Sequence, residues 1–192
     1  MPDLPEDVTV RALELIDRRD KVMERLQALA SFEIQSFKIR IHGDYHLGRV
    51  LRVKNDYVIV HFEGEPGQPL AERRAKASPL KDVATMKRSF SYAAQVALFH
   101  HANRRADESQ RLREFAALWE RQTSSLFLKA YRQAMTDARL LPGENDLRKL
   151  LDIFLLDKAF SELQYEIKNR PHWINIPLHG LLGILGEGNQ FG

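Results

Sequence analysis

The first stretch of the chain, residues 5–30, alternates charged and apolar residues at a helical period. Leu13, Ile16, Met23, Leu26 and Ala30 fall on one helical face, and charged residues separate them. This pattern predicts one amphipathic helix, which we assign to residues 1–31.

The pattern then changes from a helical period to the alternation typical of strands. Lys38–Ile41 is a short strand candidate, and the β-rich runs Val50–Val53 and Tyr57–Phe62 flank Lys54-Asn55-Asp56. Two such runs around an Asn-Asp turn predict a hairpin. Residues 64–82 form a long connection with prolines, glycines and several charges, and long connections in compact domains are often functional.

Everything after Ser78 is predicted to be helical. Ser78 is suited to cap a helix whose first residue is Pro79 and which runs to about Ala102. A second helix starts near Asp107, and its predicted core stripe is Leu112, Phe115, Leu118, Trp119, Leu126, Phe127 and Tyr131.

A third helix is predicted from Asn145 to Asn169 and ends at Pro171. Its apolar stripe is Leu147, Leu150, Leu151, Phe154, Leu155, Ala159 and Leu163. Pro177 opens a short terminal helix, and residues 186–192 are expected to fray.

Composition narrows the class of protein. The 192 residues are 44% hydrophobic and 29% charged, as in one soluble globular domain long enough to bury a core. The net charge of +3 does not indicate a nucleic-acid partner, and the absence of cysteine excludes disulfides and thiolate chemistry. The N-terminus is acidic, and no apolar run reaches membrane-spanning length. We therefore expect a cytoplasmic protein with neither nucleic acid nor membrane as partner.

The densest functional signal begins at His42-Gly43-Asp44. Kinases place a catalytic Asp in a His-x-Asp loop, an amide that helps to hold magnesium five residues later, and a metal-binding Asp before Phe after a hairpin. By spacing, Asp44 takes the base position, Arg49 the amide position and His61 the metal-Asp position. His-x-Asp alone fixes only two residues, so its spacing is weak support by itself.

Longer segments strengthen this interpretation. The chain resembles maltokinases, which are aminoglycoside-phosphotransferase-like kinases that phosphorylate maltose with ATP and are often fused to trehalose synthase. The resemblance extends from Leu13 to Leu185. Its matching segments are 42–48, 62–66, 69–74, 78–84, 88–94, 165–166, 169–173 and 176–178.

The resemblance implies an α+β fold, namely the C-terminal lobe of a protein-kinase-like enzyme of the aminoglycoside phosphotransferase type. It is expected to be mostly helical, with a small catalytic-loop hairpin. Residues 1–192 would form one such lobe, with the leading helix at 1–31, the catalytic loop and hairpin at 37–66 and a helical substrate-binding subdomain at 79–185. The N-terminal lobe has no counterpart, so we expect a truncated product that binds nucleotide poorly alone.

The family uses ATP and Mg²⁺, but the metal positions of this chain are altered. Maltokinases have Gln where this chain has Arg49, and Asp where it has His61. Magnesium demands oxygen ligands, so both protein ligands are replaced. Arg49 is also expected to pair with Asp44, lowering the carboxyl pKa and weakening it as a base. The expectation is a pseudokinase with little or no activity.

Two other chemistries stay open at these positions. Arg49 can contact phosphate oxygens without a metal, or Glu63 and Glu65 can supply a displaced carboxylate ligand. A zinc site is the other possibility, because imidazoles suit zinc. Its ligands would be His42, His46 and His61, although the resemblance gives His42 and His46 no metal-binding role.

The resemblance also implies a substrate pocket for maltose or a related disaccharide. Its expected lining residues are Tyr165, Glu166, Arg170 and Trp173, with an aromatic face stacked on a sugar ring. Core packing is the alternative for Trp173. In the long connection, Arg73 and Arg74 either face a phosphate or are loop charges that order the chain.

Two functions follow as hypotheses. One is a residual maltokinase completed by a separately encoded N-terminal lobe. The other is an inactive sugar-binding or interaction module that docks on trehalose synthase. In either case we expect exposed apolar surface near the hairpin and some self-association.

Overall fold

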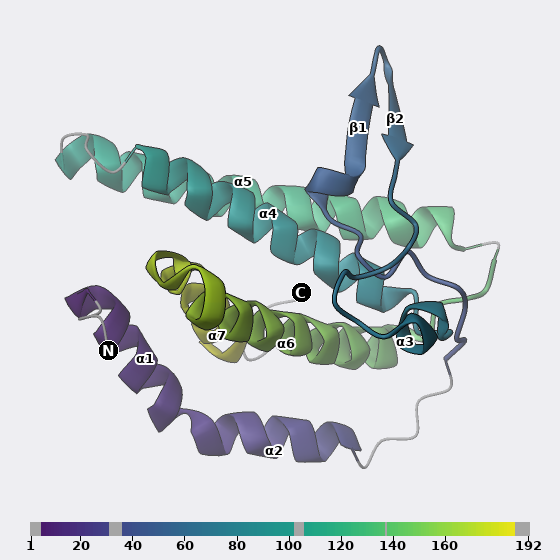
Figure 1. Cartoon of the computed structure of the whole chain (residues 1–192), viewed down its shortest axis with the longest axis horizontal. Helices are drawn as coiled ribbons and strands as arrows, with labels where there is room; N and C mark the ends of the chain where they lie inside the picture. The colour runs from purple at the N-terminus through teal and green to yellow at the C-terminus, as the bar shows by residue number, and fades with distance from the viewer. Residues whose placement is uncertain (1–4, 31–35, 102–105, 137, 187–192) are drawn as a thin grey trace. The chain divides into compact units, whose positions relative to one another are not determined.

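The computed structural model describes residues 5–30, 36–101, 106–136 and 138–186, which fall into two compact units (Figure 1). Unit 1 combines Met1–Ile34 with Arg148–Gly192, and unit 2 is Gln35–Leu147. In chain order the elements are α1 Glu6–Asp17, α2 Arg19–Ala30, η1 Leu47–Arg49, β1 Val50–Val53, β2 Asp56–Ile59, α3 Leu70–Arg74, α4 Leu80–His100, α5 Ala106–Ala134, α6 Glu144–Asn169, η2 Pro171–Trp173 and α7 Asn175–Gly186. The prediction of a mostly helical α+β fold is confirmed.

Unit 2 is built on the long helices α4 and α5, which lie side by side, and the hairpin projects away from them (Figure 1). Phe90 of α4 makes edge contacts with Trp119 and Phe127 of α5, with ring centroids 6.2 and 5.7 Å apart. The predicted hairpin forms, and its antiparallel register pairs Val50 with Ile59. The strand predicted at Lys38–Ile41 is wrong in extent, because only Ile39 pairs, in one antiparallel bridge with Ala77 through two backbone hydrogen bonds of 2.9 and 3.0 Å.

The start of α4 follows from its sequence. Helix α4 begins at Leu80 with Pro79 in the capping position, so it begins one residue later than predicted and Ser78 is not its cap. The Ser78 hydroxyl still accepts the backbone N–H of Leu80 at 3.3 Å. Leu80, Val83 and Ala84 are completely buried. This buried first turn fixes the side of α4 that faces the loop at residues 42–49.

Unit 1 has two small apolar clusters. In the first, Val22 of α2 packs with Leu156 and Ala159 of α6 and with Leu181 and Leu185 of α7. The second cluster contains Val8, Ile174 and Leu178. The predicted stripe of α6 is confirmed at four positions, which are the buried residues Leu147, Leu151, Leu155 and Ala159.

The leading helix differs from its prediction. It is two helices, because the backbone departs from helical geometry at Arg18, whose side chain donates to the Leu182 carbonyl at 3.5 Å. Arg25 of α2 likewise donates to the Ile184 carbonyl at 2.7 Å. The break therefore accompanies two arginine contacts to backbone carbonyls near the C-terminal end of α7.

The buried face of these helices was also predicted wrongly. Val8 and Val22 are buried, with Ala12 and Leu15 packed against them. The side chain of Ala30 lies outside the described part, and the other members of the predicted stripe are exposed, namely Leu13, Ile16, Met23 and Leu26. The helical period groups residues on a face, but it does not tell which face a neighbour covers.

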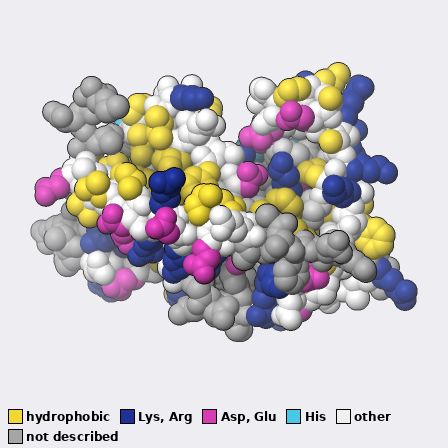
Figure 2. Space-filling model, turned by 90° about the horizontal axis from the view of Figure 1, so that it is seen from below, with side chains coloured by type: hydrophobic (Ala, Val, Ile, Leu, Met, Phe, Trp, Pro, Cys, Tyr) yellow, Lys and Arg dark blue, Asp and Glu magenta, His cyan; other side chains and the backbone are white. Residues whose placement is uncertain are grey.

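The same error affects α5, where four residues of the predicted core stripe are exposed rather than buried, namely Phe115, Leu118, Trp119 and Leu126. Figure 2 shows many hydrophobic side chains at the surface of the face that it draws. Among the described residues, no helix combines the length and the apolar character needed to cross a bilayer. The predicted frayed end lies outside the described residues beyond Gly186.

Candidate active site

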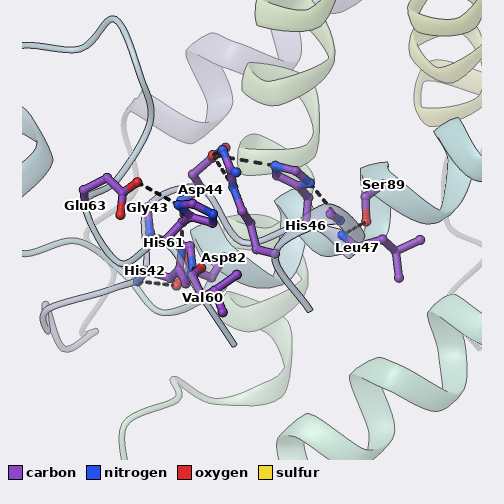
Figure 3. Close-up of polar contacts among 12 residues, drawn as sticks. His42, Gly43, Asp44, His46, Leu47, Val60, His61, Glu63, Asp82 and Ser89 are labelled. Carbon is purple, nitrogen blue, oxygen red and sulfur yellow. Dashed lines mark hydrogen bonds and ion pairs between the residues drawn. The ribbon is translucent and has the colours of Figure 1, made fainter. Parts of the chain in front are cut away.

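The loop at residues 42–49 is held at its base by Asp82 of α4 (Figure 3). The two Asp82 carboxylate oxygens accept the backbone N–H groups of His42 and Gly43, at 2.7 and 2.9 Å. Asp82 lies in the matching segment 78–84, but no role was predicted for it. The sequence signal that could have indicated this role is the position of Asp82 in the first turn of α4, because unpaired N–H groups there favour a negative charge.

The charge of Asp82 also affects its neighbours. Burial raises the pKa of Asp82, while the two N–H groups that it accepts act in the opposite direction. Burial first, and then the negative charge of Asp82, raises the pKa values of Tyr45 and Tyr131. The raised pKa values keep both phenols protonated beside the Asp82 carboxylate.

His42 locks the loop through both of its ring nitrogens. Its Nε2 lies 2.9 Å from the Val60 carbonyl oxygen, and its Nδ1 lies 3.2 Å from the backbone nitrogen of Asp44. Because a carbonyl only accepts and an N–H only donates, Nε2 has the proton and Nδ1 is the acceptor. The ring therefore fixes the backbone of Asp44 and has no nitrogen left for a zinc ion.

Gly43 and Gly64 bring the loop and the chain after β2 close together. Gly43 has a φ of +80°, and a Cβ there would lie 3.4 Å from the Cα of Gly64. Gly64 has a φ of +81°, and a Cβ there would approach the Cβ of Arg73 to 3.2 Å. Both positions need the left-handed conformation that glycine adopts at little cost.

Asp44 presents its two oxygens to different surroundings. Oδ2 accepts from Nε and Nη2 of Arg49 at 3.0 and 2.6 Å and lies 3.6 Å from Nε2 of His46. Oδ1 has no hydrogen-bond partner among the described residues. Burial alone would raise the pKa of Asp44, but hydrogen bonds and charge from His46 and Arg49 outweigh it, so the pKa is lowered. The contact expected between Arg49 and Asp44 is present, on one carboxylate oxygen.

The other end of the loop is fixed by short polar contacts. Nδ1 of His46 accepts the backbone N–H of Gly48 at 3.1 Å. The Ser89 hydroxyl of α4 accepts from the backbone N–H of Leu47 at 3.1 Å and donates to the Met86 carbonyl at 2.7 Å. Both ends of the loop are therefore held by α4.

His61 lies beside the loop and pairs with Glu63 (Figure 3). Its Nδ1 is 3.1 Å from Oε1 of Glu63, and both side chains are more than half exposed. The backbone N–H of Glu63 itself, and then His61, lower the pKa of Glu63. Arg73 packs against Gly64 and donates to the Glu63 carbonyl at 3.3 Å, which fits the role of ordering the connection.

The remaining two candidates of this region lie further along the connection. Arg74 is exposed at the end of α3, and Glu65 is half-buried, with its carbonyl accepting the Gln68 N–H at 3.3 Å.

The magnesium ion that the resemblance implies does not fit these residues. A guanidinium offers no lone pair to a metal, and Arg49 already occupies Oδ2 of Asp44. Within the described ranges, no group of three or more His, Asp or Glu side chains could hold a metal ion. The hard oxygen set that Mg²⁺ requires is therefore missing at the predicted positions.

The predicted substrate residues meet in unit 1. Both carboxylate oxygens of Glu166 accept from Arg170, at 2.9 and 2.6 Å, and the Glu166 side chain is only 1% exposed. The guanidinium of Arg170 lies 5.2 Å from the ring centre of Tyr165 and 4.7 Å from that of Trp173. The buried Glu166 carboxylate thus orients the guanidinium of Arg170. Tyr165 is 54% exposed and is the more accessible of the two rings.

The lowered pKa of Asp44 gives a pH prediction. The unfolded chain takes up a proton near the ordinary value of about 3.9, whereas folded Asp44 does so at lower pH. The stabilisation by ionised Asp44 is thus complete above the ordinary value and is lost as pH falls toward the folded pKa. In Asp44→Asn, the free energy of unfolding should fall less than in the wild-type chain when the pH is lowered from about 5 to about 3, as measured by urea unfolding. Arg49→Gln should reduce this fall too, and curves parallel to wild type would contradict the prediction.

Two curated proteins that are similar to this chain in sequence are both glucosamine kinases. The chain is 30% identical over 166 residues to a glucosamine kinase of Streptacidiphilus jiangxiensis, covering 86% of this chain and 35% of that protein. It is 31% identical over 152 residues to a glucosamine kinase of Mycolicibacterium smegmatis (strain ATCC 700084 / mc(2)155), covering 78% of this chain and 35% of that protein. The chain thus spans about a third of the length of these curated relatives. No family model matches the chain.

Solved structures agree with the sequence relatives. A glucosamine kinase in complex with glucosamine, ADP and inorganic phosphate matches with a TM-score of 0.74 and 26% identity, covering 92% of this chain and 42% of that chain. A second glucosamine kinase crystal form matches with a TM-score of 0.73 and 25% identity, over 93% of this chain and 41% of that one. The kinase-like fold is therefore supported by structure as well as by sequence.

These relatives correct two predictions. The resemblance to maltokinases and the maltose partner are wrong, because the relatives found are glucosamine kinases and one binds glucosamine and ADP. A trehalose synthase partner and an inactive docking module find no support among them. The coarser prediction, likeness to a sugar kinase, agrees with all of them. The motifs surrounding Asp44 concern phosphoryl transfer and do not specify the accepting sugar.

Proposed function

We propose that this chain contains the acceptor side of an ATP-dependent aminosugar kinase, with glucosamine as the acceptor. The observation that supports it is the position of Asp44, which is buried and fixed in its loop while Oδ1 has no partner among the described residues. The similarity to a glucosamine kinase bound to glucosamine and ADP adds the class of substrate.

In the proposed reaction, Oδ1 of Asp44 accepts a hydrogen bond from the acceptor hydroxyl. The oxygen of the sugar hydroxyl attacks the terminal phosphorus of ATP, and the bond from this phosphorus to the ADP oxygen breaks. The hydroxyl proton passes to Asp44. Arg49 and His46 act on Oδ2, so they orient the carboxylate without blocking Oδ1. Phosphoryl transfer depends mainly on positioning and charge, so the lowered pKa of Asp44 is compatible with this role.

The aromatic group of unit 1 is a second part of the proposal. Tyr165 and Trp173 offer ring faces of the kind that stack on sugars, and Arg170 lies against both. Glu166 is proposed as a positioning residue, because its buried carboxylate contacts Arg170 through both oxygens.

Binding of sugars to the purified chain tests this function. We expect glucosamine to raise the unfolding temperature in a saturable way, with maltose giving no shift and glucose a smaller one than glucosamine. A ligand at about 100 times its dissociation constant stabilises the folded state by roughly 2.7 kcal/mol, which thermal unfolding detects. Asp44→Asn should weaken the effect of glucosamine, whereas Asp56→Asn in the exposed hairpin turn should leave it unchanged. An equal shift with maltose, or none with glucosamine, would refute the proposal.

A further inference from the structure

Arg49 lies beside Asp44 and is five residues after it in the chain. In the kinase motif this position belongs to the amide that helps to hold magnesium. We propose that the Arg49 guanidinium replaces the divalent cation at this site, so that the loop binds the phosphate groups of a nucleotide without metal. The inference rests on the proposed function for the identity of the ligand, but the geometry of Arg49 is independent of it.

The donors of Arg49 are only partly used. Nε and Nη2 donate to Oδ2 of Asp44, and Nη1 has no partner among the residues that the structure describes. The side chain is 24% exposed, so a ligand can reach it. A guanidinium is always charged and its planar set of donors matches phosphate oxygens, which makes it a suitable anion contact.

The same contacts oppose a divalent cation. Oδ2 of Asp44 already accepts hydrogen bonds from two nitrogens of Arg49 and lies 3.6 Å from Nε2 of His46. Glu63, the other carboxylate beside the site, pairs with His61 at 3.1 Å. A metal ion would have to displace the Arg49 guanidinium from Asp44, or the His61 ring from Glu63, before it could bind the carboxylate.

The ring signals of His46 and His61, observed by NMR, report on this site in the complete chain. In EDTA, pyrophosphate should shift the His46 signal in a saturable manner, because His46 shares Asp44 with Arg49. In a separate sample without EDTA, added Mn²⁺, which broadens signals close to a bound ion, should not broaden His46 or His61 selectively. Selective broadening in the wild-type chain would overturn the proposal.

Variants distinguish pyrophosphate binding at Arg49 from non-specific attraction of an anion to a positively charged protein. Arg49→Gln should weaken pyrophosphate binding at His46 at least tenfold, and Arg49→Lys should retain part of it because the charge remains. Arg52→Gln, which removes an exposed arginine three residues away in β1, should have no effect. An Arg49→Gln/His61→Asp double variant, which restores oxygen donors, should gain Mn²⁺ broadening at His46.

Equal pyrophosphate binding by wild type and Arg49→Gln would refute the inference. A chain that binds pyrophosphate as expected but does not bind glucosamine would leave this site standing and would refute the proposed aminosugar acceptor instead.

Discussion

Replacing Asp82 by alanine is expected to lower the free energy of unfolding by about 3 kcal/mol and to free the base of the loop at residues 42–49. The Asp82 carboxylate accepts the N–H groups of His42 and Gly43 at 2.7 and 2.9 Å, and the His42 side chain is buried. Its loss leaves two backbone donors without their acceptor, and each such donor costs roughly 1–3 kcal/mol when buried. Urea unfolding measures the total, and amide hydrogen exchange at Gly43 measures the local release.

Two variants make this prediction specific. Asp82→Asn retains one accepting oxygen and should lose less stability than the alanine variant. Lys81→Ala, at the exposed neighbouring position, should change stability by less than about 0.5 kcal/mol. If hydrogen exchange at Gly43 is unchanged in Asp82→Ala, α4 does not hold the loop in the manner described.

Leu181→Ala is expected to destabilise unit 1 by about 3 kcal/mol. Leu181 is completely buried and packs with Val22, Leu156 and Leu185, so its removal leaves a cavity lined by three helices. The chain has one tryptophan in each unit, Trp119 and Trp173. Urea unfolding followed by Trp173 fluorescence in a Trp119→Phe background therefore reports on unit 1 separately.

Leu13→Ala is the matched control, because the same atoms are removed from a side chain that is 56% exposed. It should cost less than about 1 kcal/mol, since little apolar area returns to water. Similar losses for Leu13→Ala and Leu181→Ala would mean that the face of α1 predicted from the sequence is the buried one after all.

The hairpin and the long helices α4, α5 and α6 were predictable because they depend on local signals, whereas α3 lies in a segment predicted as a connection. Ser78-Pro79 marked the start of α4 to within one residue, and the turn at Lys54-Asn55-Asp56 marked the hairpin. Which side of α1, α2 or α5 is buried depends on neighbours far along the chain, so the exposed Phe115 and the buried Val22 could not be predicted. The break at Arg18 likewise depends on contacts with α7.

The site was partly predictable for a similar reason. The spacing of His42, Asp44 and Arg49 placed them in one loop, and the contact of Arg49 with Asp44 followed from their opposite charges. The contact of the His42 ring with the backbone of Asp44 was not predicted. Asp82 comes from another element, 38 residues after Asp44, and only the fold shows that it supports the loop. The maltose partner was predicted wrongly because the residues of the loop motif do not distinguish one sugar hydroxyl from another.

The most direct test of the proposed acceptor site follows the glucosamine titration residue by residue in the ¹⁵N-labelled chain. We predict saturable shifts at the amides of Gly43 and Asp44, absent with maltose and weakened at least tenfold in Asp44→Asn. Saturable binding of glucosamine with no change at these two amides, or an equal response to maltose, would contradict it.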